Sequence, residues 1–302
     1  MVDITHKNNT LRTAIAQAIV LVSKQETMDA LINRTVPKGD VFEMAKTAGL
    51  FAAKRTADMI PDCHPLPVEY TKVDYEVDGL KVFVKVEIRT VYKTGVEVEA
   101  MHAASVVALT MYDMLKPIDK EIEIHHIKLL QKKGGKSGHK DVFTVPIKTA
   151  VLVCSDSIAN GNKEDQSGKV IIDKLKSHPV EVLHYSIIPD GVEIIQTQIK
   201  EYLSKEVELI LITGGTGLSK RDFTPEAVKP LLDREIPGIG EHLRQYGQNR
   251  MPYAILSRSI GGLIGNTLVI ALPGSTNGAK ESMDALFPGV LHLFKMIHSG
   301  KH

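Results

Sequence analysis

Side chains suited to acid–base chemistry recur in the first half of the sequence. Lys54 stands in the run AAKRT, and Cys63-His64 stands between Pro61 and Pro65. Flanking prolines stiffen a loop, which suits a side chain that has to be aimed at a ligand. The alternatives are an exposed lysine and an ordinary loop histidine, and a lone Cys-His pair lacks the three or four ligands of a zinc site.

Acidic residues supply the other partner for such chemistry. Glu97 and Glu99 are two apart, so in an extended segment both carboxylates face the same side and need a cation, a proton or a metal ion to offset their repulsion. Asp113 and Lys116 are three apart on a predicted helix and can touch. A solvated strand face and a routine surface pair are the alternatives. Together with Lys54, these residues predict an acid–base site.

A glycine-rich loop in the second half is suited to an anion. Thr213–Gly217, with the sequence TGGTG, follows the apolar strand Leu209–Ile212. Glycines let backbone N–H groups approach a phosphate, although a tight turn is the alternative and the ending of a Walker loop is missing. Asp222 comes between this loop and a helix start at Thr224-Pro225, with Thr224 as the N-cap. A carboxylate beside a phosphate site predicts Mg²⁺ between the two.

Three further polar residues follow predicted strands. Asp156 comes after an apolar run that ends at Cys154, Asp190 after one that ends at Ile188, and Ser275 after one that ends at Leu272. Ligands of parallel sheets bind beyond the carboxyl ends of the strands, so these residues can converge on one crevice. Each of them taken singly is also an ordinary turn residue.

The elements that must position these residues differ between the halves. In the first half, the patterns predict a helix from the cap at Asp40 to Ile60, strands Thr71–Val77 and Val82–Ile88 around an Asp78-Gly79 hairpin, a helix Glu99–Lys116 and a strand Ile122–Leu130. This is an α+β antiparallel sheet with helices. In the second half, buried strands Val151–Cys154, Val182–Ile188, Leu209–Thr213 and Thr267–Leu272 alternate with helices such as Ser167–Lys176 and Ile194–Leu203. This is an α/β three-layer sandwich with a mostly parallel sheet.

The length of the chain and a change in local composition indicate two domains that meet near its midpoint. Its 302 residues suit two domains, and a polar, glycine-rich stretch at 132–141 precedes the fresh apolar run at 150–154. We therefore predict domains 1–147 and 148–302. The net charge of +1, from 37 basic and 36 acidic residues, argues against a nucleic-acid-binding protein.

Cysteine content and apolar runs in the sequence bear on the cellular compartment. Two distant cysteines, Cys63 and Cys154, indicate a reducing compartment. The polar start MVDITHKNNT is no secretory signal, and no apolar run approaches the roughly 18 residues of a membrane span. We expect a cytoplasmic protein without a membrane partner.

The first half resembles the cyclic pyranopterin monophosphate synthases of the MoaC family, which act in molybdenum cofactor biosynthesis. The matching stretches are PKGDVF at 37–42, AAKRTADMIPDCHPL at 52–66, KTGVEVEAMHAASVVALTMYDMLK at 93–116 and KKGGKSG at 132–138. The resemblance implies a ferredoxin-like fold, a GTP-derived cyclic dihydroguanosine triphosphate as substrate, and release of pyrophosphate. Asp62, where the family more often has an apolar residue, is a departure.

The same resemblance implies residue roles. Lys54 and Lys116 are expected to transfer protons, since a lysine that is desolvated or near other cations can lose its proton near neutral pH, and Asp113 is expected to orient Lys116. The implied substrate-binding residues are Cys63, His64, Glu97, Val98 and Glu99, with Glu97 and Glu99 on the guanine-derived edge or on magnesium, and with Arg34, Lys133 and Lys136 on the triphosphate.

The second half resembles molybdopterin adenylyltransferases of the MogA and MoaB type. The matching stretches include IPD at 188–190, TGGTGLSKRDFTPEA at 213–227, DREIPGIGEHLR at 233–244 and LPGS at 272–275. The resemblance implies molybdopterin and Mg–ATP as ligands and AMP transfer to the pterin phosphate, with no prosthetic group. Carried over by position, Asp190 and Asp222 are catalytic, Asp222 is linked to Mg²⁺, and the substrate-binding residues are Asp156, Gly214, Gly215, Thr216, Glu241 and Ser275.

Two rival functions stay open at this point. The second half can be a non-catalytic module for pterin binding or oligomerisation, and the whole chain can be a nucleotide-binding scaffold. Both families favour threefold assemblies, so we expect a homo-oligomer, a trimer or a hexamer, in which fusion secures equal amounts or shared symmetry.

Overall fold

The computed structural model describes residues 1–135 and 141–299. The chain divides into two compact units, Met1–His139 and Lys140–His302. The domain boundary predicted between residues 147 and 148 lies one residue inside the first strand of the second unit, which begins at Ile147. Each unit has its own hydrophobic core.

The first unit is the predicted antiparallel sheet with helices. Its elements, in chain order, are β1 (Thr10–Leu21), α1 (Gln25–Ile32), α2 (Val41–Lys54), α3 (Thr56–Met59), β2 (Tyr70–Asp78), β3 (Lys81–Tyr92), α4 (Glu97–Leu115) and β4 (Glu123–Lys133). The strand order is β2-β3-β1-β4, and every neighbouring pair is antiparallel. This arrangement confirms the ferredoxin-like fold class.

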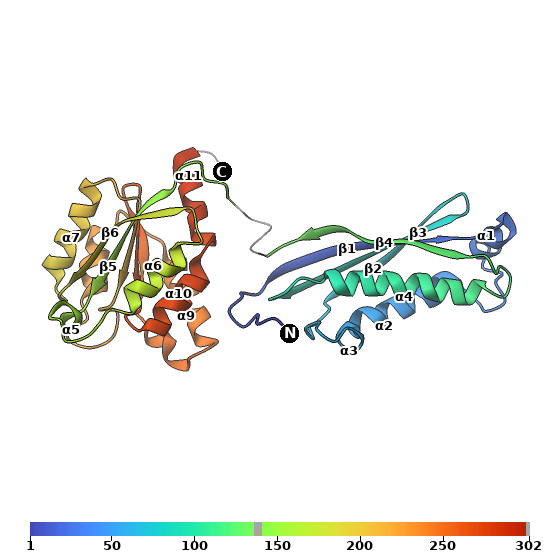
Figure 1. The fold of residues 1–302 in the computed structure, drawn as a ribbon, viewed down its shortest axis with the longest axis horizontal. Coiled ribbons are helices and arrows are strands. Elements are labelled where there is room, and N and C mark those ends of the chain that lie inside the picture. The colour runs from blue at the N-terminus through green and yellow to red at the C-terminus, as the bar shows by residue number, and fades with distance from the viewer. Residues whose placement is uncertain (136–140, 300–302) are drawn as a thin grey trace. The chain divides into compact units, whose positions relative to one another are not determined.

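The two long helices α2 and α4 cover one face of this sheet (Figure 1). Alternation along the strands buries Val82, Val84 and Val86 against them. The helices pack closely at Gly49, where a Cβ atom would lie 2.5 Å from Val107 Cγ2. The predicted cap of α2 is confirmed, since the Asp40 side chain accepts a hydrogen bond from the backbone N–H of the third helical residue.

Two features of the first unit differ from the prediction. The central strand β1 was not predicted, because its buried positions are occupied by Ala14, Ala16 and Ala18, and alanine is a weak strand signal. The helix predicted to reach Ile60 ends at Lys54, since Arg55 leaves helical geometry at φ −115° and ψ 19°, and a short helix α3 follows.

The second unit is the predicted α/β sandwich. It contains β5 (Ile147–Cys154), α5 (Asp156–Ala159), α6 (Ser167–Leu175), β6 (Val180–Ile188), α7 (Val192–Ser204), β7 (Leu209–Thr213), α8 (Thr224–Val228), η1 (Lys229–Leu231), β8 (Arg234–Glu235), α9 (Pro237–Gln248), η2 (Pro252–Leu256), β9 (Gly261–Ile264), β10 (Thr267–Leu272), α10 (Thr276–Leu286), η3 (Gly289–Leu291) and α11 (His292–Ser299). The strand order is β6-β5-β7-β10-β9-β8, in which β6, β5, β7 and β10 are parallel and β9 runs antiparallel to its neighbours.

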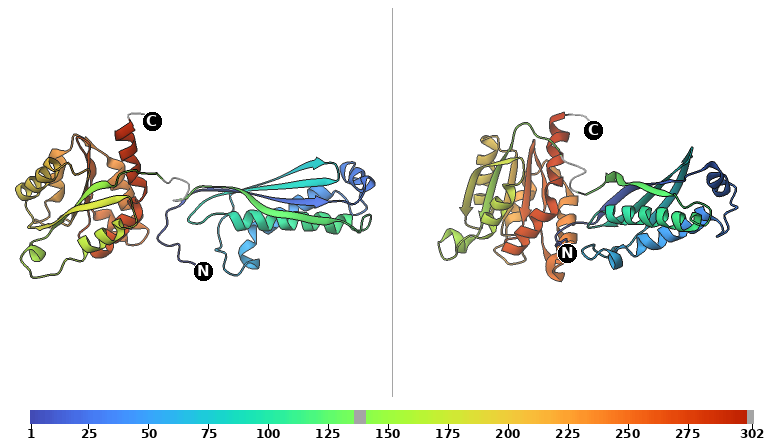
Figure 2. Two further views of the ribbon diagram at one scale, coloured as in Figure 1. Left: turned by 45° about the horizontal axis from the view of Figure 1, so that its top comes forward. Right: turned by 45° about the vertical axis from the view of Figure 1, so that its right-hand side comes forward.

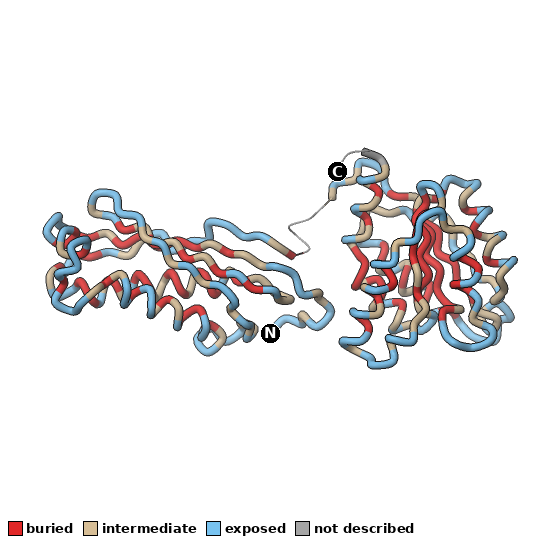
Figure 3. Tube along the Cα trace, turned by 180° about the vertical axis from the view of Figure 1, so that it is seen from behind, coloured by how far each residue is buried: buried red, intermediate tan, exposed pale blue. Residues whose placement is uncertain are grey.

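Helices cover both faces of this sheet, with α7 on one side and α6, α9 and α10 on the other (Figures 1 and 2). The central strands β5, β7 and β10 are buried almost throughout (Figure 3). The prediction that Val182–Ile188 is a buried strand is wrong, because β6 is an edge strand in which half-buried and exposed residues alternate.

Candidate active sites

Asp113 joins two lysines near the end of α4. Lys116 Nζ lies 2.7 Å from Asp113 Oδ1, and Lys38 Nζ lies 2.7 Å from Oδ2 and 2.8 Å from the main-chain oxygen of Asp113. The hydrogen bonds from Lys116 and then from Lys38 lower the pKa of Asp113 to about 2. In return, the hydrogen bond and the charge of Asp113 raise the pKa of Lys116. This arrangement favours the ammonium form of Lys116, and its proton-transfer role stays a prediction.

Lys38 was missed as a site residue, although it lies in the quoted PKGD stretch. The available signal for Lys38 was the turn that follows it, in which Gly39 has φ +102° and Asp40 caps α2. This turn directs the loop before α2 toward the end of α4. Arg34, predicted to hold a phosphate, lies 2.7 Å from the Asp40 carboxylate and remains exposed.

A second cluster lies at the start of α4. The Cys63 thiol donates to Glu99 Oε1 at 3.2 Å. Glu99 is only 2% exposed, and its Oε2 has no hydrogen-bond partner among the described residues. Burial raises the pKa of Glu99, and burial together with Glu99 raises the pKa of Cys63 to about 12. The cluster thus holds a thiol and a buried acid with one oxygen left for a ligand.

Glu97 and Glu99 do not share a face. Both lie in the first turn of α4, not in an extended segment, and two helical residues differ by about 200° in direction. Glu97 forms an ion pair with Lys132, whereas Glu99 is buried beside Cys63. Val98 between them is exposed. The expectation that both carboxylates face the same side is therefore wrong, because the helix directs them to different sides.

The remaining predicted residues of the first unit are spread out. His64 Nε2 lies 2.7 Å from the carbonyl oxygen of Val2, and Asp62 lies 2.6 Å from the terminal amine of Met1. Lys54 at the end of α2 and Lys133 at the end of β4 are exposed. Lys136 lies outside the described residues.

The two clusters of the first unit are separated by the length of α4. Glu99 and Asp113 are fourteen residues apart on that helix, which at 1.5 Å per residue corresponds to about 21 Å. One chain therefore does not bring Glu99 and Cys63 together with Asp113 and Lys116 around a single small ligand.

In the second unit, the glycine loop lies against the end of β5. Gly214 has φ +102°, and a Cβ atom there would lie 2.1 Å from the carbonyl oxygen of Cys154. The N-cap prediction for Thr224 is wrong, because Phe223 holds the cap position and the Thr224 hydroxyl donates to the Gly214 carbonyl at 2.8 Å. Thr224 therefore fastens the loop to the start of α8.

Two of the predicted aspartates meet at neighbouring strand ends. Asp156 and Asp190 each donate a backbone N–H to the other's carboxylate, at 3.2 and 3.1 Å. Asp190 Oδ1 is buried and has no hydrogen-bond partner among the described residues. Burial, and then the charges of Asp156 and Asp222, raise the pKa of Asp190. A Cβ atom on Gly215 would lie 3.0 Å from Asp190 Oδ1, so the glycine leaves room beside that oxygen.

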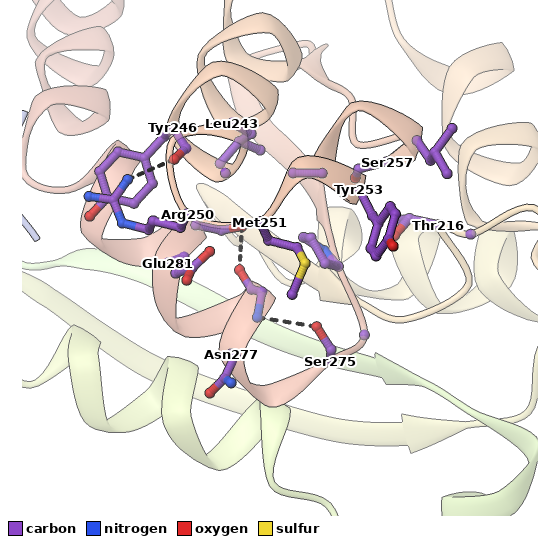
Figure 4. A pocket seen from close by; sticks show the side chains of 18 of the residues that line it. Thr216, Leu243, Tyr246, Arg250, Met251, Tyr253, Ser257, Ser275, Asn277 and Glu281 are labelled. Atoms are coloured by element: carbon purple, nitrogen blue, oxygen red, sulfur yellow. Dashed lines mark hydrogen bonds between the residues drawn. The ribbon is translucent and has the colours of Figure 1, made fainter.

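A cavity of about 870 Å³ opens next to the glycine loop (Figure 4). Thr216 and Ser275, both predicted, line it, and Ser275 accepts a hydrogen bond from the N–H of Gly278 at the start of α10. Glu241 is exposed on α9 and does not belong to the lining of this cavity.

Two tyrosines that line the cavity were not predicted from the sequence. Figure 4 shows Tyr246 with Arg250 over its ring, at 3.5 Å from the ring centroid, and Tyr253 by Thr216. Tyr246 is 4% exposed and belongs to the hydrophobic core, whereas Tyr253 is 75% exposed. The exposed ring of Tyr253 is therefore the one on which a planar ligand can stack.

Comparisons with known proteins match both halves. Residues 1–135 match the MoaC family, and residues 150–292 match the probable molybdopterin binding domain. The chain is 38% identical to a molybdenum cofactor biosynthesis bifunctional protein from Chlorobaculum tepidum, across 100% of this chain and 96% of that relative. The chain therefore belongs to the family of bifunctional molybdenum cofactor biosynthesis proteins.

Further relatives agree with this family. A molybdenum cofactor biosynthesis bifunctional protein from Synechococcus elongatus is 38% identical and covers 100% of this chain and 98% of its own length. A cyclic pyranopterin monophosphate synthase from Nitratidesulfovibrio vulgaris is 51% identical over 46% of this chain and 86% of its own length. In this bifunctional chain, no helix among residues 1–135 and 141–299 is long and apolar enough to cross a membrane.

Proposed function

We propose that the first unit is a cyclic pyranopterin monophosphate synthase, which converts the GTP-derived cyclic dihydroguanosine triphosphate to its product and pyrophosphate. The observation that carries this proposal is the placement of Lys38 and Lys116 on the two oxygens of Asp113. The charge of Asp113 holds two ammonium groups side by side, and such groups neutralise a triphosphate and donate protons to a departing pyrophosphate.

The other cluster has a different role in this proposal. In this proposal the free Oε2 of Glu99 accepts a hydrogen bond from the substrate's guanine-derived edge, Cys63 lies beside Glu99, and His64 also contacts the substrate. Lys54 is a second proton-transfer group, and Arg34, Lys133 and Lys136 hold phosphates. Purified Lys116→Ala protein that forms product from purified substrate at the unchanged rate would contradict these assignments.

We infer that this site is completed by a second copy of the chain. Because about 21 Å of α4 separates Glu99 from Asp113, a substrate that touches both clusters needs one cluster from each of two copies. We propose a homo-oligomer with threefold symmetry. Mixing the inactive variants Glu99→Gln and Lys116→Ala is expected to restore part of the activity, since mixed pairs contain one intact site. A solution mass of one chain, or no recovery after mixing, contradicts this inference.

We propose that the second unit transfers AMP from Mg–ATP to molybdopterin. The unpartnered Asp190 Oδ1, beside the glycine loop and near Asp222, supports this function most directly, since a buried acceptor needs a partner that a ligand or its metal ion supplies. Gly214, Gly215 and Thr216 approach the phosphates, and the cavity lined by Thr216 and Ser275 receives the pterin.

Magnesium fits these residues if phosphates complete its shell. Among residues 1–135 and 141–299, no group of three or more His, Cys, Asp or Glu side chains is arranged to hold a metal ion. Mg²⁺ usually takes one or two carboxylates together with substrate phosphates, which Asp190 and Asp222 match. When bound, the ion neutralises phosphate charge; the protein positions the nucleotide and excludes water around the reacting phosphate.

The test uses the full chain with molybdopterin, ATP and magnesium. Formation of adenylylated molybdopterin and pyrophosphate, lost in Asp222→Asn, supports the proposal. Pterin binding without AMP transfer by the wild-type chain supports the rival in which the second unit is a binding or oligomerisation module. If the chain binds nucleotides but neither unit catalyses a reaction, the result supports the hypothesis that the whole chain is a nucleotide-binding scaffold.

A further inference from the structure

Arg258 fastens both ends of the loop that carries Asp222. Its Nε donates to the Gly217 carbonyl at 2.7 Å, and its Nη2 donates to the Asp222 carbonyl at 2.7 Å. Its own backbone N–H donates to the carbonyl of Thr216 at 3.1 Å. Arg258, which comes two positions after η2, thus holds the segment from 216 to 222 by three hydrogen bonds.

The contacts inside this loop do not replace that tie. Ser219 N–H donates to Asp222 Oδ2 at 2.7 Å, and Asp222 N–H donates to the Ser219 carbonyl at 3.0 Å. Both bonds lie within one turn, so they set the shape of the turn but not its position against the sheet. No helix or strand is present between Thr213 and Thr224. Thr224 joins the end of the loop to Gly214 and Gly215, and Arg258 holds the stretch between, so the position of the Asp222 carboxylate also depends on the guanidinium.

The charge arrangement keeps that carboxylate available. Arg258 binds the main-chain oxygen of Asp222, and it forms its ion pair with Glu226 instead. A second, smaller cavity of about 290 Å³ is lined by Asp222, Glu226 and Arg258 among others. A direct Arg258–Asp222 ion pair would compete with a metal ion for the carboxylate, and this geometry avoids it.

We propose that Arg258 is a positioning residue for Asp222, holding its carboxylate where the magnesium–nucleotide complex binds. The inference rests on the proposed AMP transfer by the second unit. A guanidinium presents several donors in a rigid plane, so it can hold two carbonyls at once, whereas the single ammonium of a lysine cannot keep both at the same geometry. Arg258 acts through the loop and does not touch the reacting phosphates.

The test compares Arg258→Gln and Arg258→Lys with the wild-type full chain, and Arg234→Gln on the exposed strand β8 is the matched control. In Arg258→Gln, the Mg²⁺ concentration for half-maximal AMP transfer is expected to rise about tenfold or more, the loss expected when hydrogen bonds from a charged group are removed. The KM for molybdopterin is expected to change less. Arg258→Lys is expected to fall between the two, and Arg234→Gln to match the wild type.

A second readout is independent of catalysis. Amide hydrogen exchange of the peptide covering 217–223 is expected to accelerate in Arg258→Gln and partly in Arg258→Lys, with Mg–ATP affinity by calorimetry reduced in the same order. Unchanged exchange and unchanged Mg²⁺ dependence in both variants overturn the inference. A wild-type chain that transfers no AMP contradicts the proposed function instead, and the exchange and affinity measurements then decide on Arg258 alone.

Discussion

Asp156 and Asp190 hold each other by their backbones: each N–H donates to the other's carboxylate, at 3.2 and 3.1 Å. The two residues follow β5 and β6, which are parallel neighbours, so the exchange locks two strand ends together. One consequence is that Asp190 Oδ1 points to a buried place with no partner among the described residues. The pKa of Asp190 rises because of burial and of the charges of Asp156 and Asp222.

Replacing Asp190 by Asn is expected to abolish function without loss of stability. A raised pKa means that the folded chain binds the proton more tightly than the unfolded chain. Ionised Asp190 therefore costs stability, and this cost grows as the pH rises from the ordinary aspartate range to the raised pKa. Asp190→Asn removes the cost, so the melting temperature at pH 7 is expected to stay equal or increase, while AMP transfer falls by about 100-fold or more.

Calorimetry at pH 5 and pH 7, together with the transfer assay, checks this expectation. Asp173→Asn is the control, since Asp173 forms an exposed pair with Lys176 at 3.1 Å. Wild-type transfer rates in Asp190→Asn, or a large drop in its melting temperature, would contradict the account.

Lys38→Ala is expected to reduce formation of cyclic pyranopterin monophosphate by about 100-fold or more, the range typical for loss of a proton-transfer or charge-neutralising group. Lys38 grips the same carboxylate as Lys116. Lys72→Ala is a close control, because Lys72 lies 2.8 Å from Asp74 with exposure of 52% and 53%, the same values as in the Lys116–Asp113 pair. Equal rates in the Lys38 and Lys72 variants would remove Lys38 from the site.

Asp113→Asn is expected to lower the pKa of Lys116 towards the ordinary lysine value, because Asp113 supplies the hydrogen bond and the charge that raise it. Unprotonated lysine reacts with acylating reagents, so Lys116 is expected to be modified faster at pH 9 in this variant. Mass spectrometry of the labelled peptide measures the rate, with Lys72 as the internal reference. Labelling of Lys116 that does not accelerate would show that Asp113 does not control its proton.

The sequence predicted both folds because binary patterns are strong where strands have one buried face. Val84, Val86 and Ile88 alternate with Lys85, Glu87 and Arg89, and the strand–helix alternation of the second half is equally clear. The central strand β1 escaped because alanine fills its buried face. The site was harder to predict, because contacts such as Lys38–Asp113 join residues 75 positions apart.

Register on α4 explains the main error at the site. Two residues of spacing place Glu97 and Glu99 together in a strand but apart in a helix, and the helix begins at Glu97. The roles of Arg250 and Arg258 were missed, since what these residues do depends on carbonyls and rings that only the folded chain brings near them.

Cys63 is expected to react slowly with alkylating reagents and to react faster in Glu99→Gln. Burial and the Glu99 carboxylate raise the pKa of the thiol to about 12, so little thiolate is present at pH 8. Removing the charge of Glu99 lowers that pKa and increases the thiolate fraction. The rate of iodoacetamide modification measures the effect, in a Cys154→Ala background so that one thiol reacts. Equal rates with Glu99 and with Gln at this position would contradict the coupling.

Gly214→Ala is expected to destabilise the second unit much more than Gly265→Ala. Both glycines have positive φ, +102° and +57°, which costs an alanine about 1–2 kcal/mol. At Gly265 a Cβ atom meets nothing within 4 Å, whereas at Gly214 it would lie 2.1 Å from the Cys154 carbonyl oxygen, a backbone atom that cannot turn away. We expect a loss of about 3 kcal/mol or more for Gly214→Ala, or roughly 6–12 °C in melting temperature. Scanning calorimetry checks this, and the transition of the first unit is expected not to move. Equal losses in the two variants would mean that the close approach of the glycine loop to β5 is not what requires a glycine at position 214.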